Sequence, residues 1–538
     1  MEYQEAKYGT VRPDLYPPKS PPAEKAPIIL NAFQQQLHDH FERYGLFALF
    51  IGIWGTFCFF RNPSGITYPL FIAAAYGGAC HFLPSLGIPV KKDSLFLAGA
   101  ALVLGINSCT TVSPALWHLN LWAQILLGTI FLLHQCYSDQ AWNIGKYVNS
   151  ILRFWLQSLR SLPLPFLHGA EFVKHLKSAK SKNILMALAG ILAGIPAVIY
   201  LGSLLADADA VFHSILQRLV LNLFNPSTIF TFILMLALFF LGAYCLLGSA
   251  CAMNIPGECS EKSKRNPMAA ISFTFMVALL YLSFCLVQII YLFGQREGLP
   301  GHMTYAQYAR QGFFQLLAVA VLNLILVLNC LKFFKSHKVL SCLLVIISIC
   351  TYIMIASAAY RMLLYVRVYS LTFLRLFVLW FLGLLSLLML GVLALLFYRT
   401  FPLFRWCLVT VTLAYAIFAW SHPDYLIARY NIAQESGWIN ADNVEYLIGS
   451  LSADAAPAIA DARIDPEILG RNIYLYHSSK ISMPLDGKAQ LISCLSGIPW
   501  YPGNTGRIPA SWHPGIRSYN FSTANAWKLT QTSAYSSK

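Results

Sequence analysis

Eleven apolar stretches dominate this sequence, and away from their ends they contain almost no ionisable side chain. A helix needs roughly 20 residues to cross the hydrocarbon core of a membrane. Helices are required because backbone groups in lipid must find hydrogen-bond partners within their own segment. The chain is therefore predicted to be an all-α polytopic integral membrane protein with about 11 transmembrane helices. The stretches, of which the fourth is short, are Tyr44–Phe60, Ile66–Leu83, Leu95–Val112, Leu119–Leu133, Ile184–Leu205, Ile229–Leu247, Ala270–Phe293, Phe313–Leu331, Val339–Ser357, Leu376–Phe397 and Phe404–Trp420.

The distribution of Lys and Arg predicts the orientation of these helices. The N-terminal tail and the even-numbered connections carry 22 of the 38 basic residues, and the odd-numbered connections carry 7. Cytoplasmic loops are enriched in Lys and Arg, so we expect a cytoplasmic N-terminus and, after an odd number of spans, a C-terminal tail outside. The net charge of +15 then reflects this bias, and no nucleic-acid partner is indicated.

The connection 134–183 is unusually long and basic. It holds seven Lys and Arg residues against Asp139 and Glu171, and apolar Phe154, Trp155 and Leu159 have helical spacing. This pattern predicts an amphipathic helix on the inner leaflet with its basic side near anionic lipid. The alternative is that these charges only set the topology, and we favour that simpler interpretation.

The interior of the spans argues against an ion-coupled carrier, which needs charged or titrating groups within the membrane. Away from their ends the spans offer amides instead, and amides inside membranes more often join helices to one another than bind ligands. These amides are Asn107, Gln124, Gln288, Asn323 and Asn329. No zinc-type Cys/His spacing or glycine-rich phosphate loop is present, so no metal is predicted and any cofactor is unknown.

Several blocks of polar and aromatic residues stand out in the second part of the chain. They are Tyr305–Phe314, Arg361–Tyr365, Leu371–Arg375, Ile427–Asn431, Tyr446–Ala458 and Arg517–Ser522. These blocks resemble two families of bacterial membrane proteins that are catalogued as domains of unknown function, numbered four-one-seven-three and four-one-five-three. The similarity covers about residues 184–522, with Ser370 replacing the usual Gly, and no family-like block is evident in the N-terminal third. It implies a polytopic protein of the cell envelope and supplies no activity.

The chain is thus expected to divide into five parts. Residues 1–43 form a proline-rich, disordered cytoplasmic tail, and 44–133 form a four-helix membrane segment. The basic cytoplasmic connection 134–183 leads into a family-like membrane core of seven helices at 184–420. Residues 421–538 form an extracytoplasmic tail of short helices followed by loops.

The candidate site is a group of polar residues predicted on the outer face, close to the ends of the spans. Asp207 and Asp209 are paired carboxylates that suit a divalent cation or a phosphosugar, although a helix cap is the favoured interpretation. Three arginines outside are equally consistent with anchoring in lipid headgroups and with a phosphate clamp. The complete group is Asp207, Asp209, Tyr308, Arg310, Arg361, Arg367, Arg375, Asp424 and Arg429.

Two expectations concern how these residues are arranged. Arg361 and Arg375 are 14 positions apart, close to four helical turns, so one continuous helix would place them on one face. Asp424 is expected to pair with Arg429 or with one of the other arginines. Tyr308 and Arg310 are typical of an interfacial anchor.

Three functions from different classes agree with these features. We favour a non-enzymatic assembly, sensing or resistance factor of the inner membrane, whose outer face binds a lipid headgroup or a protein partner. The first alternative is an outer-face enzyme acting on lipid-linked sugar or phosphate, for example polyprenyl-phosphate. The second is a lipid transporter.

Overall fold

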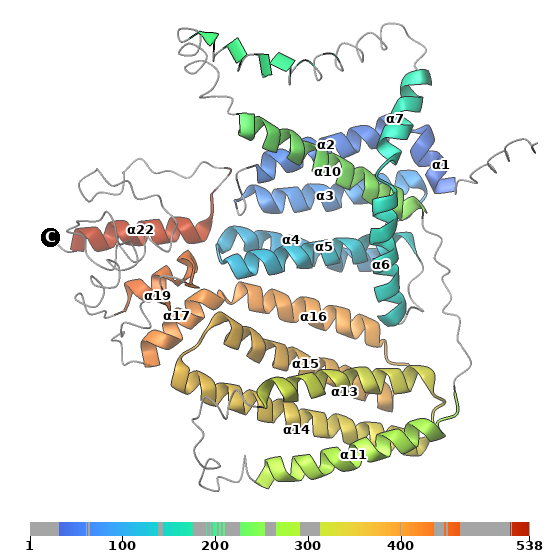
Figure 1. Cartoon of the computed structure of the whole chain (residues 1–538), viewed down its shortest axis with the longest axis vertical. Coiled ribbons are helices and arrows are strands. Elements are labelled where there is room, and N and C mark those ends of the chain that lie inside the picture. The colour runs from blue at the N-terminus through green and yellow to red at the C-terminus, as the bar shows by residue number, and fades with distance from the viewer. Residues whose placement is uncertain are drawn as a thin grey trace, which may run out of the picture.

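The structure is a computed structural model, and it describes residues 32–60, 65–137, 144–175, 226–252, 265–290, 312–398, 400–434, 450–462 and 519–536 together with a few isolated positions. Within these residues the regular secondary structure is helical, apart from one isolated bridge between Arg265 and Phe334. The longer helices lie roughly side by side and run across Figure 1. They are α2 (Phe41–Phe59), α3 (Thr67–Phe82), α4 (Leu95–Thr110), α5 (Pro114–Cys136), α10 (Pro226–Ala252), α11 (Met268–Gln288), α13 (Phe313–Phe333), α14 (Lys338–Tyr369), α15 (Phe373–Phe397) and α16 (Leu403–Trp420).

Eight of these helices are long and apolar enough to cross a membrane, which makes the chain a multi-pass membrane protein. They are α4, α5, α10, α11 and α13 to α16, and each coincides with one of the predicted stretches. The predicted stretch Leu119–Leu133 is part of the 23-residue α5, so its apparent shortness in the sequence was misleading.

The remaining three predicted spans have different outcomes. The first two are helical, but α3 has only 16 residues and α2 begins with the polar pair Glu42 and Arg43, so neither is among the eight. Most of the predicted span Ile184–Leu205 lies outside the described residues. The total of 11 spans therefore stays a prediction.

Close helix packing in the first half depends on small residues. A Cβ atom added at Gly55 of α2 would lie 2.8 Å from the ring of Phe239 on α10, and one at Gly52 would lie 3.3 Å from Leu236. Glycines let two membrane helices approach one another closely. Because Phe41 contacts Tyr244 and Phe60 contacts Phe232, α2 and α10 run antiparallel.

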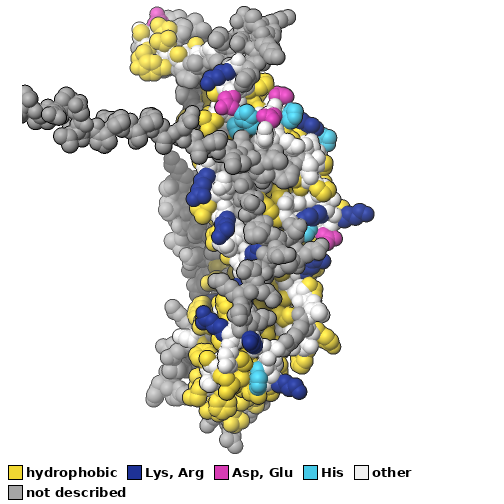
Figure 2. All heavy atoms as spheres, turned by 90° about the vertical axis from the view of Figure 1, so that its right-hand side faces the viewer, with side chains coloured by type: hydrophobic (Ala, Val, Ile, Leu, Met, Phe, Trp, Pro, Cys, Tyr) yellow, Lys and Arg dark blue, Asp and Glu magenta, His cyan; other side chains and the backbone are white. Residues whose placement is uncertain are grey.

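The two ends of the bundle are different. At one end, short helices α17 (Pro423–Gln434), α19 (Ala456–Ala460) and α22 (Phe521–Ser536) gather beyond the spans, and we call this the α17 end (Figure 1). At the other, the α6 end, α6 (Ile144–Arg160) lies across the long helices, with α1 (Ala32–Asp39) and α7 (Leu164–His175) nearby. Figure 2 faces the α6 end, where Lys and Arg side chains are spread over the surface and acidic ones are fewer.

The helix is interrupted between α14 and α15, and this interruption corrects one expectation. Helix α14 ends at Tyr369, and Ser370 has φ 65° and ψ 167°, which no helix accommodates. The Asn431 side chain then pairs with both backbone polar groups of Leu371, at 2.7 and 2.9 Å. Arg361 and Arg375 consequently belong to two different helices, and the predicted single helical face does not exist.

Candidate functional site

The buried charged side chains of the described residues are Arg361, Asp424 and Asp454. All three lie at or near the α17 end, outside the middle of the bundle. Burying a charge is costly unless hydrogen bonds or an opposite charge compensate for it. The partners of these groups therefore show what this end of the protein is built to do.

Asp454 connects three segments that are far apart in the sequence. It lies in the short turn Ala453–Ala455, and its side chain is 1% exposed. The hydroxyls of Thr111 and Ser522 donate to its two carboxylate oxygens, and the Val112 amide donates to Oδ1 at 3.2 Å. Charge-assisted bonds of this kind are stronger than bonds between neutral groups, so Asp454 fastens the C-terminal region to the turn between α4 and α5.

Asp424, near the start of α17, is held by Ser452. Its Oδ2 accepts from the Ser452 hydroxyl at 2.7 Å and from the Ser452 amide at 3.2 Å. Burial raises the pKa of Asp424, and the bond from Ser452 opposes that rise. Since the Ser452 hydroxyl also accepts from the Asp454 amide at 3.4 Å, one serine links the two acidic residues. Among the described residues no ion pair joins Asp424 to Arg429 or to another arginine. Arg310 lies outside these residues, so a pairing of Asp424 with Arg310 stays a prediction.

His422 connects this group to solvent. It has φ 49° at the turn between α16 and α17, and its side chain is 35% exposed. Its Nδ1 lies 3.7 Å from Asp454 Oδ2, and the adjacent Asp454 carboxylate raises the pKa of His422 above the usual value of 6.5. We name the six residues Thr111, His422, Asp424, Ser452, Asp454 and Ser522 the carboxylate cluster.

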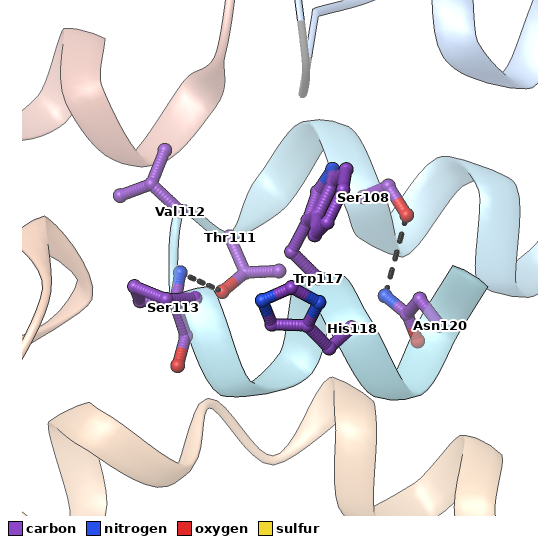
Figure 3. A pocket seen from close by; sticks show the side chains of 8 residues that line it. Ser108, Thr111, Val112, Ser113, Trp117, His118 and Asn120 are labelled. Carbon is purple, nitrogen blue, oxygen red and sulfur yellow. Dashed lines mark hydrogen bonds between the residues drawn. The ribbon is translucent and has the colours of Figure 1, made fainter. Parts of the chain in front are cut away.

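A pocket of about 280 Å³ adjoins the carboxylate cluster, with Thr111 belonging to both. Figure 3 shows the rings of Trp117 and His118 beside one another between Thr111 and Asn120. Ring centroids of Trp117 and His118 are 4.8 Å apart. The described residues that line the pocket are Ser108, Thr111, Val112, Ser113, Pro114, Trp117, His118 and Asn120, and none of these is Lys, Arg, Asp or Glu.

An amide network forms the inner wall of the pocket. Asn120 donates to Asn107 at 3.1 Å and to Ser108 at 3.2 Å, and its carbonyl accepts from the Tyr415 hydroxyl at 2.7 Å. Asn107 in turn donates to the backbone of Ala419 on α16 at 3.0 Å. The prediction that buried amides join helices is confirmed here, and also at Asn323, which bonds to Tyr281 and Thr351.

Arg361 occupies a second polar site at this end. Its guanidinium is 3.5 Å from the side-chain oxygen of Gln288, which also accepts from Ser357 at 2.7 Å. A Cβ atom added at Gly312 would lie 2.8 Å from Arg361 Nη1. Arg361 is therefore enclosed by α11, α13 and α14 and is not a headgroup anchor on the surface.

Arg375 has a structural role. Its Nη1 donates to the carbonyl oxygens of Tyr369 and Ser370, and its guanidinium lies 4.3 Å from the ring centroid of Tyr365. Basic side chains at a helix C-terminus satisfy its last carbonyl groups. These contacts use Arg375 to close the end of α14 and leave it poorly placed for the proposed phosphate clamp.

The other predicted site residues are not brought together by the described part of the structure. Arg367, Arg429 and Asp209 are exposed. Asp207, Tyr308 and Arg310 lie outside the described residues, so the interpretations placed on them stay predictions. Within the described ranges no group of three His, Cys, Asp or Glu side chains is arranged to hold a metal ion.

Sequence reasoning found Asp424 but missed Asp454, His422, Thr111 and Ser522 as site residues. The family-like blocks contained the signal. The blocks Tyr446–Ala458 and Arg517–Ser522 both contribute to the carboxylate cluster, and Ile427–Asn431 supplies the amide that holds Leu371. The candidate site is therefore the place where these blocks come together, and not the predicted group of outer arginines.

The fold and this site define a helical multi-pass membrane protein with a polar site at one end of its bundle. The chain belongs to the family described as Domain of unknown function (DUF4153), which matches residues 98–462. The match begins within α4, so the family region extends further toward the N-terminus than the expected start at residue 184, and it ends before the expected end at residue 522. No curated protein and no solved structure matches the chain.

Proposed function

We propose that the chain is a non-catalytic factor of the cell envelope that binds a lipid headgroup in the pocket beside the carboxylate cluster. The observation that carries this proposal is the hydrogen bonding of the two carboxylates, Asp424 and Asp454. Asp454 receives three hydrogen bonds and Asp424 receives two, all from the protein's own side chains and backbone. Such carboxylates fasten segments together and are poorly suited to attack a substrate.

The lining of the pocket favours an uncharged headgroup. A phosphate group is normally held by Arg, Lys or several backbone amides, and none of the described lining residues is basic except His118. The rings of Trp117 and His118 instead suit a hydroxylated group such as a sugar or glycerol, with the ring nitrogens of His118 as the hydrogen-bonding groups. Aromatic rings with polar neighbours provide both an apolar face and a wet edge for such a ligand.

Native mass spectrometry of the detergent-purified protein tests this proposal. We expect the wild type to retain a lipid with a neutral hydroxylated headgroup, and Trp117→Ala to lose it without a large change in thermal stability. Trp122→Ala is the matched control, because Trp122 lies on the same helix but is 68% exposed. Retention that is equal in Trp117→Ala and wild type would disprove the pocket as the binding site.

One observation supports the enzymatic alternative. A buried aspartate that orients a half-exposed histidine is an arrangement used in general acid–base catalysis, and Asp454 stands in this relation to His422. Incubation of the purified protein with its retained lipid separates the two functions. Conversion of that lipid, abolished in His422→Gln, would establish the enzyme and exclude the binding factor.

The proposed location is the cytoplasmic membrane, with the N-terminus inside and the α17 end outside. The charge bias of the connections supports this orientation. A membrane-impermeant maleimide should label Asp461→Cys in intact cells, against the background of the native cysteines, and should label Arg153→Cys only after the cells are permeabilised. The reverse pattern would invert the orientation.

A further inference from the structure

Helix α6 has three distinct faces along its length. One face packs against the bundle through buried Tyr147, Ser150, Phe154 and Ser158. Tyr147 stacks on Phe404 of α16 with ring centroids 3.7 Å apart, and Ser249 of α10 donates to the Phe154 carbonyl at 2.8 Å. The helix is therefore fixed to two of the spanning helices.

The second face is apolar and exposed. Its residues recur at intervals of three and four, which places them along one stripe of a helix. Their exposed fractions, from 39% to 63%, are far above those of the buried face. The stripe consists of Val148, Leu152, Trp155, Leu156 and Leu159.

The third face is basic. Arg153 and Arg160 are exposed and seven positions apart, which is close to two helical turns. α6 itself contains no acidic residue. Glu171 on the following helix α7 is engaged by His38 of α1, and Lys174 lies one turn further along α7. The basic side chains therefore make the electrostatic potential along this face positive.

We propose that α6 is a binding surface for anionic phospholipid in the leaflet at the α6 end. In Figure 1 the helix lies across the ends of the spans, which is the direction of a membrane plane. With one side fixed to the bundle, its apolar stripe enters the acyl region and its basic face meets the headgroups. Helices with these two faces lie in the membrane interface and are attracted to anionic lipid. The Lys and Arg side chains spread over this end in Figure 2 supply the same charge complementarity.

The test compares lipid retained by the full chain after reconstitution in equimolar phosphatidylcholine and phosphatidylglycerol. Native mass spectrometry of the re-extracted protein gives the enrichment of phosphatidylglycerol. We expect enrichment for the wild type and a decrease of about fivefold per removed charge for the double variant Arg153→Gln/Arg160→Gln. Because both side chains are exposed, thermal unfolding in phosphatidylcholine alone should be the same for both proteins.

The matched control is Lys332→Gln/Lys335→Gln, which removes one basic residue from the last turn of α13 and one from the connection that follows it, at the same end. We expect it to keep most of the enrichment. An equal loss in the control would show that net charge alone attracts the lipid, and unchanged enrichment in the α6 variant would show that α6 does not bind it. Either result overturns the proposal without bearing on the pocket at the α17 end.

Discussion

The Thr111 hydroxyl donates a hydrogen bond to the carboxylate of Asp454, which lies 343 positions later in the chain. Thr111 ends α4, whereas Asp454 belongs to the segment that follows the last spanning helix. A second donor, Ser522, belongs to the first turn of α22. One carboxylate thus joins the early membrane helices to two parts of the C-terminal region, and it does so in a site almost closed to solvent.

Replacement of Asp454 tests the strength of this connection. Asp454→Asn removes the negative charge. It also replaces one carboxylate oxygen, which accepts hydrogen bonds, with an NH2 group that faces hydroxyls acting as donors. The loss should destabilise the protein by about 1–3 kcal/mol, the usual cost of leaving buried polar groups unsatisfied. Thermal unfolding in detergent measures the effect. Asp461→Asn is the control, since Asp461 is exposed nearby, and an equal effect of both changes would contradict the assigned role.

The pH dependence of the C-terminal attachment follows from two pKa shifts in the same direction. The pKa of His422 is raised by the adjacent Asp454 carboxylate, and the pKa of Asp424 is raised by burial. A raised pKa means that the folded state binds its proton more tightly, so the contribution is complete below the ordinary value and is lost as the pH rises through the folded value. The contribution of His422 to stability should therefore decrease as the pH rises above 6.5. The contribution of Asp424 should decrease as the pH rises above 3.8.

Hydrogen exchange of residues 451–462 measures this effect. After correction for the intrinsic exchange rate, protection should decrease as the pH rises from mildly acidic to mildly alkaline. In His422→Gln the profile should become flatter, because the group that titrates nearest neutrality has been removed. A steeper profile in the variant, or rising protection in the wild type, would refute the assignment.

Ser370 is predicted to be a strained position that glycine would relieve. Its φ of 65° and ψ of 167° fall in a region occupied almost only by glycine, at a cost of roughly 1–3 kcal/mol for other residues. Ser370→Gly should therefore raise the unfolding temperature and Ser370→Ala should not, as differential scanning calorimetry would show. A loss of stability in the glycine variant would mean that the serine side chain supports the turn.

The membrane helices could be predicted from sequence because lipid demands an apolar stretch whatever the tertiary structure is. The pairing of buried amides could be predicted for the same reason, and Asn107 and Asn323 confirm it. The amphipathic character of 134–183 gave α6 correctly as a helix. Each of these features depends on local composition alone.

The carboxylate cluster could not be predicted by spacing, because Thr111, Asp454 and Ser522 share no local pattern and meet only in the folded chain. The expectation that Arg361 and Arg375 share one helical face failed for a related reason. A sequence does not show that a helix stops at Ser370, and that stop provides the free carbonyl groups to which Arg375 donates. Long-range contacts and backbone strain therefore account for both errors.

Gly312 and Arg361 allow a final prediction with an internal control. Gly312 has φ 94°, and an added Cβ atom would lie 2.8 Å from Arg361 Nη1. Gly312→Ala should cost about 1–3 kcal/mol, because a side chain is strained in this conformation and also displaces the guanidinium. Gly242→Ala, at a helical position with no atom within 4 Å, should instead stabilise by about 0.5–1 kcal/mol.

If the free energy of unfolding decreases in Gly312→Ala and increases in Gly242→Ala, backbone strain and crowding at Gly312 are distinguished from the general effect of removing a glycine. Thermal unfolding in the same detergent compares them directly. Arg361→Lys adds a further distinction, because a lysine keeps the charge but lacks the planar guanidinium. If crowding against Arg361 contributes, Gly312→Ala should cost less in the Arg361→Lys background than in the wild type, and equal costs would assign the whole effect to the backbone at Gly312.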